Sequence, residues 1–284
     1  MPELPEVETL RLQLSNLIIG QTIKNIKILK NKSFIGNPAL VIGAKLKNIR
    51  RFAKILILDL SNDFSLAIHL KLSGQLIYRG SKEPKKLEVS DPLLYALPNK
   101  HTRVIISFFS GDNLYFNDLR IFGWIKVVQT PKVKDVIEHL GPEPFKDLTI
   151  EKFEEILSSS RKPVKLVLMD QEKIAGVGNI YANEALFLAR VHPETPANKI
   201  AKKTKELLYL KLLKSLKDGI RWGGASENNF RDAYGRKGKL QEHFLVYGKE
   251  GEDCPNKCGE KIKRISLAGR GTFFCPHCQK KDFD

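Results

Sequence analysis

The hydrophobic pattern of the chain changes once along its length, and this change limits the folds that the chain can adopt. Between residues 22 and 128, short β-rich runs are separated by Gly, Asn and Asp. The runs lie at residues 23–29, 55–60, 65–70, 104–109, 114–116 and 123–128. Many short strands with turn residues between them favour a β-sandwich over alternating strands and helices. From residue 150 onward, apolar residues recur at helical spacing instead, as in Leu208, Leu212 and Leu216.

The same change divides the chain into regions and predicts a multidomain α+β protein. Val7, Leu10 and Leu14 have helical spacing, which predicts a helix that flanks the sandwich. A Gly-Pro-Glu-Pro run at residues 141–144 is typical of a linker. The predicted regions are an N-terminal β-sandwich domain at residues 1–132, a linker at 133–149, a helical domain at 150–239 and a metal-binding region at 240–284.

The charge of the chain indicates a polyanionic partner. Lys and Arg number 48 against 32 Asp and Glu, a formal net charge of +16 at pH 7. Such an excess suits nucleic acid or an anionic membrane surface, and charge alone does not choose between them. The apolar runs, such as residues 55–58, are too short to span a bilayer. The acidic, Pro-rich start has no signal-peptide pattern, so we expect a cytoplasmic protein.

All four cysteines lie near the end of the chain, at Cys254, Cys258, Cys275 and Cys278. Two close pairs separated by the length of a β-hairpin are typical of a structural zinc site rather than of a disulfide framework. We therefore predict one structural Zn²⁺, which stabilises a hairpin too small to fold alone. His277 lies inside the second pair and is an alternative ligand, although an exposed neighbour is the simpler interpretation.

The chain begins Met-Pro-Glu-Leu-Pro-Glu-Val-Glu-Thr, and this start can provide a nucleophile. Removal of Met1 would leave Pro2 with a free secondary amine. An α-amino group titrates near pH 8, roughly two and a half units below a lysine side chain. Such an amine can attack a sugar C1′ to give an iminium, with general acid–base help from Glu3. The structural alternative is a proline in the first turn of a helix, with acidic residues at the positive end of the helix dipole.

This start resembles that of the bacterial formamidopyrimidine-DNA glycosylases, and the resemblance continues over nearly the whole chain. It implies that Pro2 is the catalytic amine and Glu3 the catalytic carboxylate. Glu6 is expected to support the first helix and the proton network. It also implies that the terminal hairpin is a zinc finger that contacts DNA, with Arg270 on the phosphate of the lesion. The first cysteine pair of the family has two intervening residues, whereas this chain has three, so its local turn is expected to differ.

The helical region contains a second landmark of the same resemblance. Gly176-Val177-Gly178-Asn179 joins two predicted helices, and Asn179 suits an N-cap whose flanking amides approach a phosphate. The stretch from residue 165 to residue 184 resembles the helix–two-turn–helix motif of these glycosylases. The resemblance implies that Asn179 and Arg161 contact DNA phosphates. Lys162 and Lys165 are expected to add positive charge nearby.

The β-rich region supplies the remaining residues of the resemblance. Arg51-Phe52-Ala53-Lys54 resembles the basic hairpin of the family, in which Lys54 would bind phosphate and donate a proton. Further residues resemble those that fill the hole left by a flipped base or contact DNA: Leu72, His101, Arg120 and Phe122. Taken singly, Leu72 and Phe122 are better explained as ordinary core residues. Only together with the other motifs are they interpreted as an apolar wedge that enters between base steps.

The resemblance implies a complete reaction. The protein is expected to be a monomeric glycosylase and lyase that binds double-stranded DNA with oxidised bases or abasic sites, in the bacterial cytoplasm at the nucleoid. Pro2 displaces 8-oxoguanine or a formamidopyrimidine, and β,δ-elimination then cuts the strand. Residues 225–238 would close over the extruded base.

Two alternatives remain at this stage. An endonuclease VIII-type enzyme for oxidised pyrimidines shares most landmarks, but its start typically runs Pro-Glu-Gly-Pro-Glu, and Leu4 favours the purine branch. A zinc-dependent protein that binds damaged DNA without cutting it predicts a changed Pro2 or Glu3, and both are present.

Overall fold

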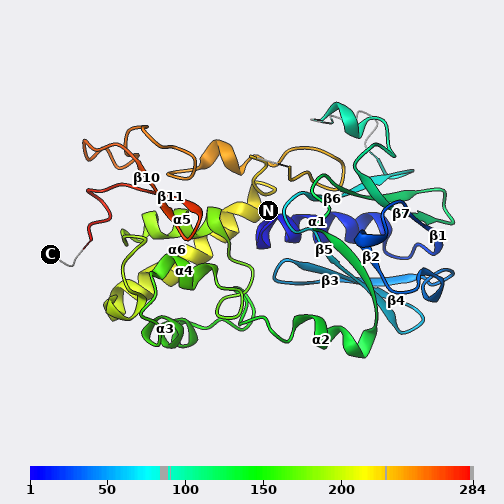
Figure 1. The fold of residues 1–284 in the computed structure, drawn as a ribbon, viewed down its shortest axis with the longest axis horizontal. Helices are drawn as coiled ribbons and strands as arrows, with labels where there is room; N and C mark the ends of the chain where they lie inside the picture. Colours follow the sequence, from blue (N-terminus) through cyan, green and yellow to red (C-terminus); the bar gives the residue numbers. More distant parts are fainter. Residues whose placement is uncertain (84–88, 90, 228, 282–284) are drawn as a thin grey trace. The chain divides into compact units, whose positions relative to one another are not determined.

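The computed structural model describes residues 1–83, 89, 91–227 and 229–281 (Figure 1). Contacts divide the chain into two compact units. The first unit comprises Met1–Glu138 and Gly219–Gln241, and the second comprises His139–Asp218 and Glu242–Asp284. The predicted order of a β-rich part before a helical part with a terminal hairpin is confirmed. The boundaries expected at residues 132, 149 and 239 stay predictions.

The first unit is built on two sheets that are mainly antiparallel. One has the order β1-β7-β8-β6, with β1 Ile23–Ile28, β7 Thr102–Phe108, β8 Asn113–Asp118 and β6 Gly74–Arg79. The other has the order β2-β9-β5-β4-β3, with β2 Phe34–Ile35, β9 Trp124–Gln129, β5 Phe64–His69, β4 Ile55–Leu60 and β3 Leu46–Phe52. Only the short pairing of β2 with β9 is parallel among the described ladders. Helix α2, Val133–Ile137, follows β9.

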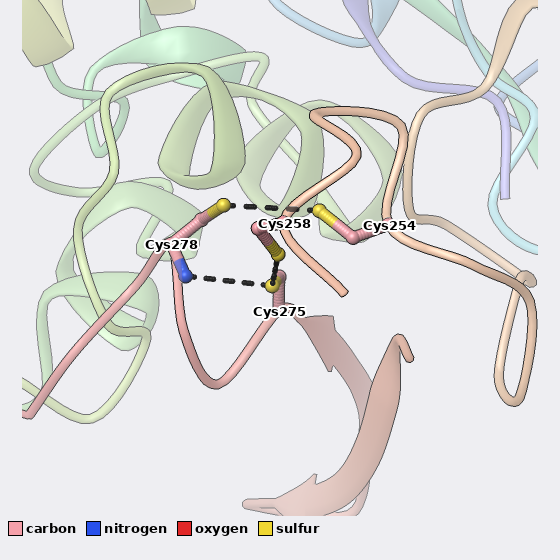
Figure 2. A group of neighbouring side chains, drawn as sticks. All are labelled: Cys254, Cys258, Cys275 and Cys278. Atoms are coloured by element: carbon pink, nitrogen blue, oxygen red, sulfur yellow. Dashed lines mark hydrogen bonds between the residues drawn. The ribbon is translucent and has the colours of Figure 1, made fainter. Parts of the chain in front are cut away.

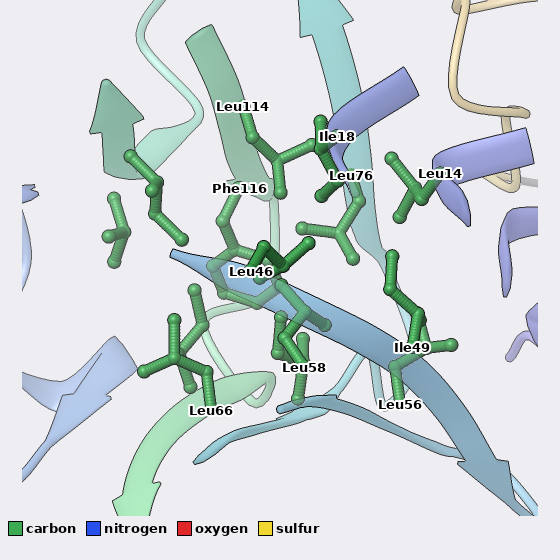
Figure 3. Packing of buried hydrophobic residues seen from close by; sticks show 14 of the residues in the cluster. Leu14, Ile18, Leu46, Ile49, Leu56, Leu58, Leu66, Leu76, Leu114 and Phe116 are labelled. Carbon is green, nitrogen blue, oxygen red and sulfur yellow. The ribbon is translucent and has the colours of Figure 1, made fainter. Parts of the chain in front are cut away.

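The core of this unit lies between the sheets and helix α1, Leu4–Ile18. Buried side chains of α1, such as Leu14 and Ile18, pack beside residues of both sheets, such as Leu58 and Phe116 (Figure 3). Alternation along the strands directs one set of side chains into this core, as strand geometry requires. Burial of these apolar groups, at roughly 25 cal/mol per Å² of apolar surface, fixes α1 along its length.

Residues 219–241 also belong to this core, although they follow the long helix of the other unit in sequence. Phe230 and Ala233 are buried in the cluster that contains α1. The amide of Tyr78 donates to the carbonyl of Ala233 at 2.8 Å, and the amide of Ala233 donates to Gln13 Oε1 at 2.9 Å. The segment is therefore held by both a strand and the first helix.

The second unit is helical and ends in a β-hairpin. Its helices are α3 Ile150–Ser158, α4 Val164–Met169, α5 Asn179–Leu188 and most of α6 Lys202–Arg221, and its strands are β10 Lys263–Leu267 and β11 Arg270–Phe274. Short 3-10 turns of the chain are η1 Asn31–Ser33, η2 Pro38–Leu40, η3 Pro92–Leu94, η4 Thr130–Lys132, η5 Ala197–Lys199 and η6 Leu240–His243. Within the described residues, no helix is long and apolar enough to cross a membrane.

A buried ion pair fixes α1 against the second sheet of the first unit. Arg51 Nε donates to Glu8 Oε2 at 2.7 Å, and the Arg51 side chain is only 6% exposed. Arg11 also binds Glu8, at 2.6 Å. Burial by itself would raise the pKa of Glu8, but hydrogen bonds from the two arginines outweigh burial and lower this pKa below its usual 4.5.

This ion pair predicts a pH-dependent stability of the first unit. The pKa of Glu8 is depressed in the folded state. The stability that ionised Glu8 contributes is therefore fully present above about pH 4.5, and it is lost as the pH falls through the folded-state pKa. We expect Glu8→Gln to lower the free energy of unfolding by about 1–3 kcal/mol at pH 7, with a smaller difference at acid pH. Urea unfolding followed by tryptophan fluorescence checks this, since Trp124 and Trp222 both lie in the first unit. If wild type and Glu8→Gln differ in free energy of unfolding by the same amount at every pH, the prediction is wrong.

Candidate catalytic centre and metal site

The start of α1 is buried and is held by one carboxylate. Pro2 and Glu3 are buried, and Glu3 is the N-cap residue of α1. The Glu3 amide donates to Glu6 Oε2 at 2.7 Å, while the Ala225 amide donates to Glu6 Oε1 at 2.8 Å. The two oxygens of Glu6 therefore join the predicted nucleophile region to the segment predicted to cover an extruded base. Sequence reasoning assigned Glu6 to the helix and the proton network, and missed its bond to Ala225.

Gly224 permits this close approach. Its φ is +83°, and a Cβ built there would lie 2.9 Å from Glu6 Cγ and 2.9 Å from the ring of Phe230. A larger residue would both strain the backbone and displace Glu6. Beyond it, Gln75 Nε2 donates to the carbonyl of Asn229 at 2.7 Å. The described part of the predicted covering segment is thus anchored to the sandwich.

Lys54 lies in the turn between β3 and β4. Ala53 has φ +50°, and Arg51 Nη1 donates to the Ala53 carbonyl at 3.0 Å. The same guanidinium binds Glu8 of α1. Lys54 is 5% exposed, so its side chain is held by the unit rather than extended into solvent. Arg51 therefore ties the turn that carries Lys54 to the helix whose N-cap is Glu3.

The residues predicted to fill the hole of a flipped base lie on two adjoining loops. Leu72 lies in the turn between β5 and β6 and is half-buried. Arg120 and Phe122 lie between β8 and β9, where the Arg120 guanidinium is 5.5 Å from the centre of the Phe122 ring. Phe122 is 48% exposed. Its exposure favours the wedge interpretation over the core interpretation.

His101 lines a cavity beside these loops. The cavity has a volume of about 200 Å³, and its wall includes Ser73, Gln75, Asn117 and Asn229. Burial, with the positive charges of Lys100 and Arg103, lowers the pKa of His101. The imidazole is therefore neutral at pH 7 and can both donate and accept a hydrogen bond. Ser73 of the β5–β6 turn and Gln75 of β6 were given no role by the sequence analysis, because Ser and Gln carry no distinctive spacing.

The helix–two-turn–helix segment differs from expectation in two details. Asn179 is the first residue of α5, and extended Gly178 is its N-cap, so the expected N-cap at Asn179 is wrong by one residue. The Asn179 side chain donates to the carbonyl of Gly271 at 3.1 Å. Lys165 is fully buried, and its Nζ contacts Thr272 Oγ1 at 2.6 Å and the same Gly271 carbonyl at 3.0 Å. It therefore supports the hairpin instead of adding surface charge, whereas Arg161 is exposed as expected.

Arg270 begins β11 at the tip of the hairpin. Leu267 pairs with Arg270 across the two residues Ala268 and Gly269, whose φ angles are +48° and +72°. Positive φ at both positions is typical of a type I′ turn. Arg270 is exposed, while the next carbonyl, that of Gly271, is held by two side chains of the same unit. The arginine is thus an exposed group on a fixed backbone.

The four cysteines converge as predicted (Figure 2). Their sulfur atoms all lie within 4.8 Å of one another, with 3.7 Å between Cys254 and Cys278 and 3.5 Å between Cys258 and Cys275. Tetrahedral coordination with Zn–S bonds of about 2.3 Å requires sulfur atoms about 3.8 Å apart, so the group fits one Zn²⁺. Burial raises the pKa of Cys254 to about 12, and a bound cation would supply the charge that favours its thiolate.

The unusual first pair is closed by a left-handed residue. Lys257 has φ +53°, and its amide donates to the Cys254 carbonyl at 2.8 Å. The extra residue is therefore absorbed in the turn, and both sulfurs still reach the cluster. His277 is exposed and is not required as a ligand, because the four thiolates complete a tetrahedral site.

Three models of known protein domains match successive parts of the chain. They are the formamidopyrimidine-DNA glycosylase N-terminal domain at residues 1–125, the formamidopyrimidine-DNA glycosylase H2TH domain at residues 140–231, and a zinc finger found in FPG and IleRS at residues 251–281. Together they cover most of the sequence in the order expected from the motifs.

Similar proteins extend this agreement over the full length. The formamidopyrimidine-DNA glycosylase of Chloroflexus aurantiacus is 40% identical over 98% of both chains. That of Ligilactobacillus salivarius is 36% identical over 98% of this chain and 99% of its own. Lactococcus lactis Fpg in complex with abasic-site DNA is 34% identical, with a TM-score of 0.86 over 98% of this chain and 100% of its own. A mutant of that Lactococcus protein in complex with Fapy-dG DNA matches at TM-score 0.86 and 35% identity, over 99% of this chain and 100% of its own.

The metal site makes a direct prediction. We expect one zinc ion per chain, a Cys275→Ser variant that loses most of it, and a His277→Ala control that retains it. The physical reason is that three thiolates leave an incomplete tetrahedral shell, and ligands removed from a structural site are not replaced by distant groups. Metal analysis of the purified variants measures the zinc content per chain. Full zinc occupancy in Cys275→Ser, or loss of zinc in His277→Ala, would exclude this ligand set.

Proposed function

The chain belongs to the formamidopyrimidine-DNA glycosylase family, and on this premise we propose that Pro2 is the nucleophile with which it excises oxidised purines from DNA. It is a DNA glycosylase of base excision repair with AP lyase activity. One observation carries the assignment of Pro2. The start of α1 is buried, and its backbone is joined through Glu6 to Ala225, so an amine at residue 2 is held in a fixed place.

The reaction follows from the chemistry of a secondary amine. After removal of Met1, the nitrogen of Pro2 attacks the deoxyribose C1′, and the bond to the damaged base breaks. Glu3 assists proton transfer on the sugar. The resulting iminium makes a 2′-proton acidic, and successive β- and δ-elimination cut the strand on both sides. Lys54 supplies a proton and a phosphate contact, and Arg270 binds the phosphate of the lesion during the second elimination.

DNA binding and base extrusion are assigned to different residues. Asn179 and Arg161 contact DNA phosphates, and His101 also contacts DNA. The net charge of +16 supplies the non-specific part of the affinity. Leu72, Arg120 and Phe122 occupy the space that the extruded nucleotide leaves. The substrate is double-stranded DNA with an oxidised base or an abasic site, and the structural relatives are complexes with such DNA. We place the enzyme in the bacterial cytoplasm, at the nucleoid, as a monomer.

The two alternatives have less support. Full-length relatives named formamidopyrimidine-DNA glycosylase, up to 40% identical among those compared, favour oxidised purines over the endonuclease VIII-type range. A protein that binds damage without cutting it has no need of the Pro2–Glu3 pair. Parallel cleavage of duplexes that carry 8-oxoguanine or thymine glycol compares the substrate ranges directly.

The nucleophile is tested by trapping. We expect borohydride to reduce the iminium and to link the protein to lesion DNA through Pro2. Pro2→Gly should lose most base excision, and a form that retains Met1 through an uncleaved extension should give little adduct because its amine is blocked. Peptide mapping identifies the modified residue. Undiminished trapping by the extended form, with the adduct on a lysine, would show that the assignment is wrong.

The division between holding and opening DNA is tested by Leu72→Ala beside Asn179→Ala. Loss of a phosphate contact should weaken binding to any duplex and reduce the salt dependence by about one contact. Loss of the wedge should leave affinity for undamaged duplex nearly unchanged and slow excision of a paired lesion, because extrusion costs a few kcal/mol. A preformed abasic site should be cut almost normally.

The measurement compares both variants on 8-oxoguanine duplex, abasic duplex and plain duplex at two salt concentrations. If Leu72→Ala loses affinity for plain duplex as Asn179→Ala does, Leu72 is a core residue and not a wedge.

A further inference from the structure

Two residues outside the proposed DNA contacts join the loops that carry the wedge. Ser73 follows Leu72 directly, and Asp118 ends β8. Ser73 Oγ donates to Asp118 Oδ1 at 2.5 Å and accepts the amide of Arg120 at 2.9 Å. Ser73 is 3% exposed and Asp118 is 0% exposed. A buried hydroxyl and a buried carboxylate therefore connect the β5–β6 turn to the β8–β9 loop.

The same carboxylate holds both ends of the β8–β9 loop. Asp118 Oδ1 accepts the amide of Arg120 at 3.2 Å, and Oδ2 accepts the amide of Gly123 at 2.7 Å. Arg103 Nε donates to the main-chain carbonyl of Asp118 at 2.8 Å. The Asp118 side chain therefore anchors this loop at its start and at its end.

Between these anchors, the backbone adopts a conformation that its residue disfavours. Ile121 has φ +57°, and a β-branched residue in the left-handed region is a genuine outlier. Lys71, beside Leu72 on the other loop, has φ +50°. Such conformations persist only where the surrounding structure over-determines them. Strand pairing of Gly74 with Asp118 and of His69 with Trp124 joins the ends of the two loops. The bonds of Ser73 and Asp118 add a side-chain link inside the loops themselves.

We propose that Ser73 and Asp118 form a clamp that positions Leu72, Arg120 and Phe122 as one preformed unit. This inference rests on the proposed function, since it concerns how these three side chains enter the duplex together. Asp118 and Ser73 are positioning residues. Side chains that are already ordered lose less entropy when they bind, so the clamp lowers the cost of inserting them. Without it, the loop ends stay paired through the strands, but the residues inside each loop are less ordered, and the insertion must order them.

The variants Ser73→Ala and Asp118→Asn test the clamp. We expect each to slow single-turnover excision of 8-oxoguanine paired with cytosine by about five- to twenty-fold, with little effect on cleavage of a preformed abasic site or on affinity for plain duplex. Asp118 is fully buried, so a matching effect in both variants points to positioning and not to a direct contact of Ser73 with the base. Hydrogen exchange of the Arg120 and Gly123 amides should become faster in the free variants.

Ser107→Ala is the matched control. Ser107 Oγ also donates to a side chain of β8, Asn113 Oδ1, at 2.6 Å. Asn113 begins β8, whereas Asp118 ends it. The control therefore removes a similar bond at the far end of the strand and should retain wild-type rates. Ser73→Thr keeps a hydroxyl and should recover part of the rate lost in Ser73→Ala.

A double-mutant cycle completes the test. If the clamp acts through the wedge, adding Ser73→Ala to Leu72→Ala should slow excision by less than Ser73→Ala does alone. Wild-type excision by both clamp variants, despite faster exchange of the two amides, would overturn the clamp and leave the proposed function intact. Equal loss on paired lesion and abasic site would also overturn it. Normal excision by Leu72→Ala, with the clamp in place, would instead refute the wedge itself.

Discussion

The geometry of the catalytic region depends on the carboxylate of Glu6. One oxygen accepts the amide of Glu3 at the start of α1, and the other accepts the amide of Ala225. These residues are far apart in the sequence, and their common partner is buried. Because α1 is itself fixed by the core and by Arg51, the first residues of the chain have a defined position. In the proposed function, this position makes a terminal amine, which is disordered in most proteins, part of the site.

The second unit uses a similar principle for the zinc finger. Lys165 and Asn179 both donate to the carbonyl of Gly271, beside Arg270. Glu184 accepts the amides of Leu245, Val246 and Tyr247, and burial raises its pKa despite these bonds. Side chains of the helix–two-turn–helix region therefore fix the segment that enters the finger and the strand that leaves its tip. The four cysteines, which fit one Zn²⁺, hold the base of the finger.

Features that depend on a local pattern or on residue spacing could be predicted from the sequence. The runs at residues 55–60 and 104–109 became β4 and β7, and the cysteine spacing located the metal site. Strand β3 was missed because its sequence, LKNIRRF, has few apolar residues and its burial is irregular. The burial of Lys165 and the bond from Ser73 to Asp118 were also missed. Each depends on partners that are distant in sequence, so neither leaves a local signal.

The central claim is that Glu6 holds the start of the chain in place for chemistry at Pro2. A crystal structure of the borohydride-reduced complex with abasic-site DNA tests it most directly. The account predicts a covalent bond from the Pro2 nitrogen to the deoxyribose C1′, with Glu6 still bound to the amides of Glu3 and Ala225. A bond from C1′ to a lysine, or a Glu6 side chain turned away from both amides, would contradict it.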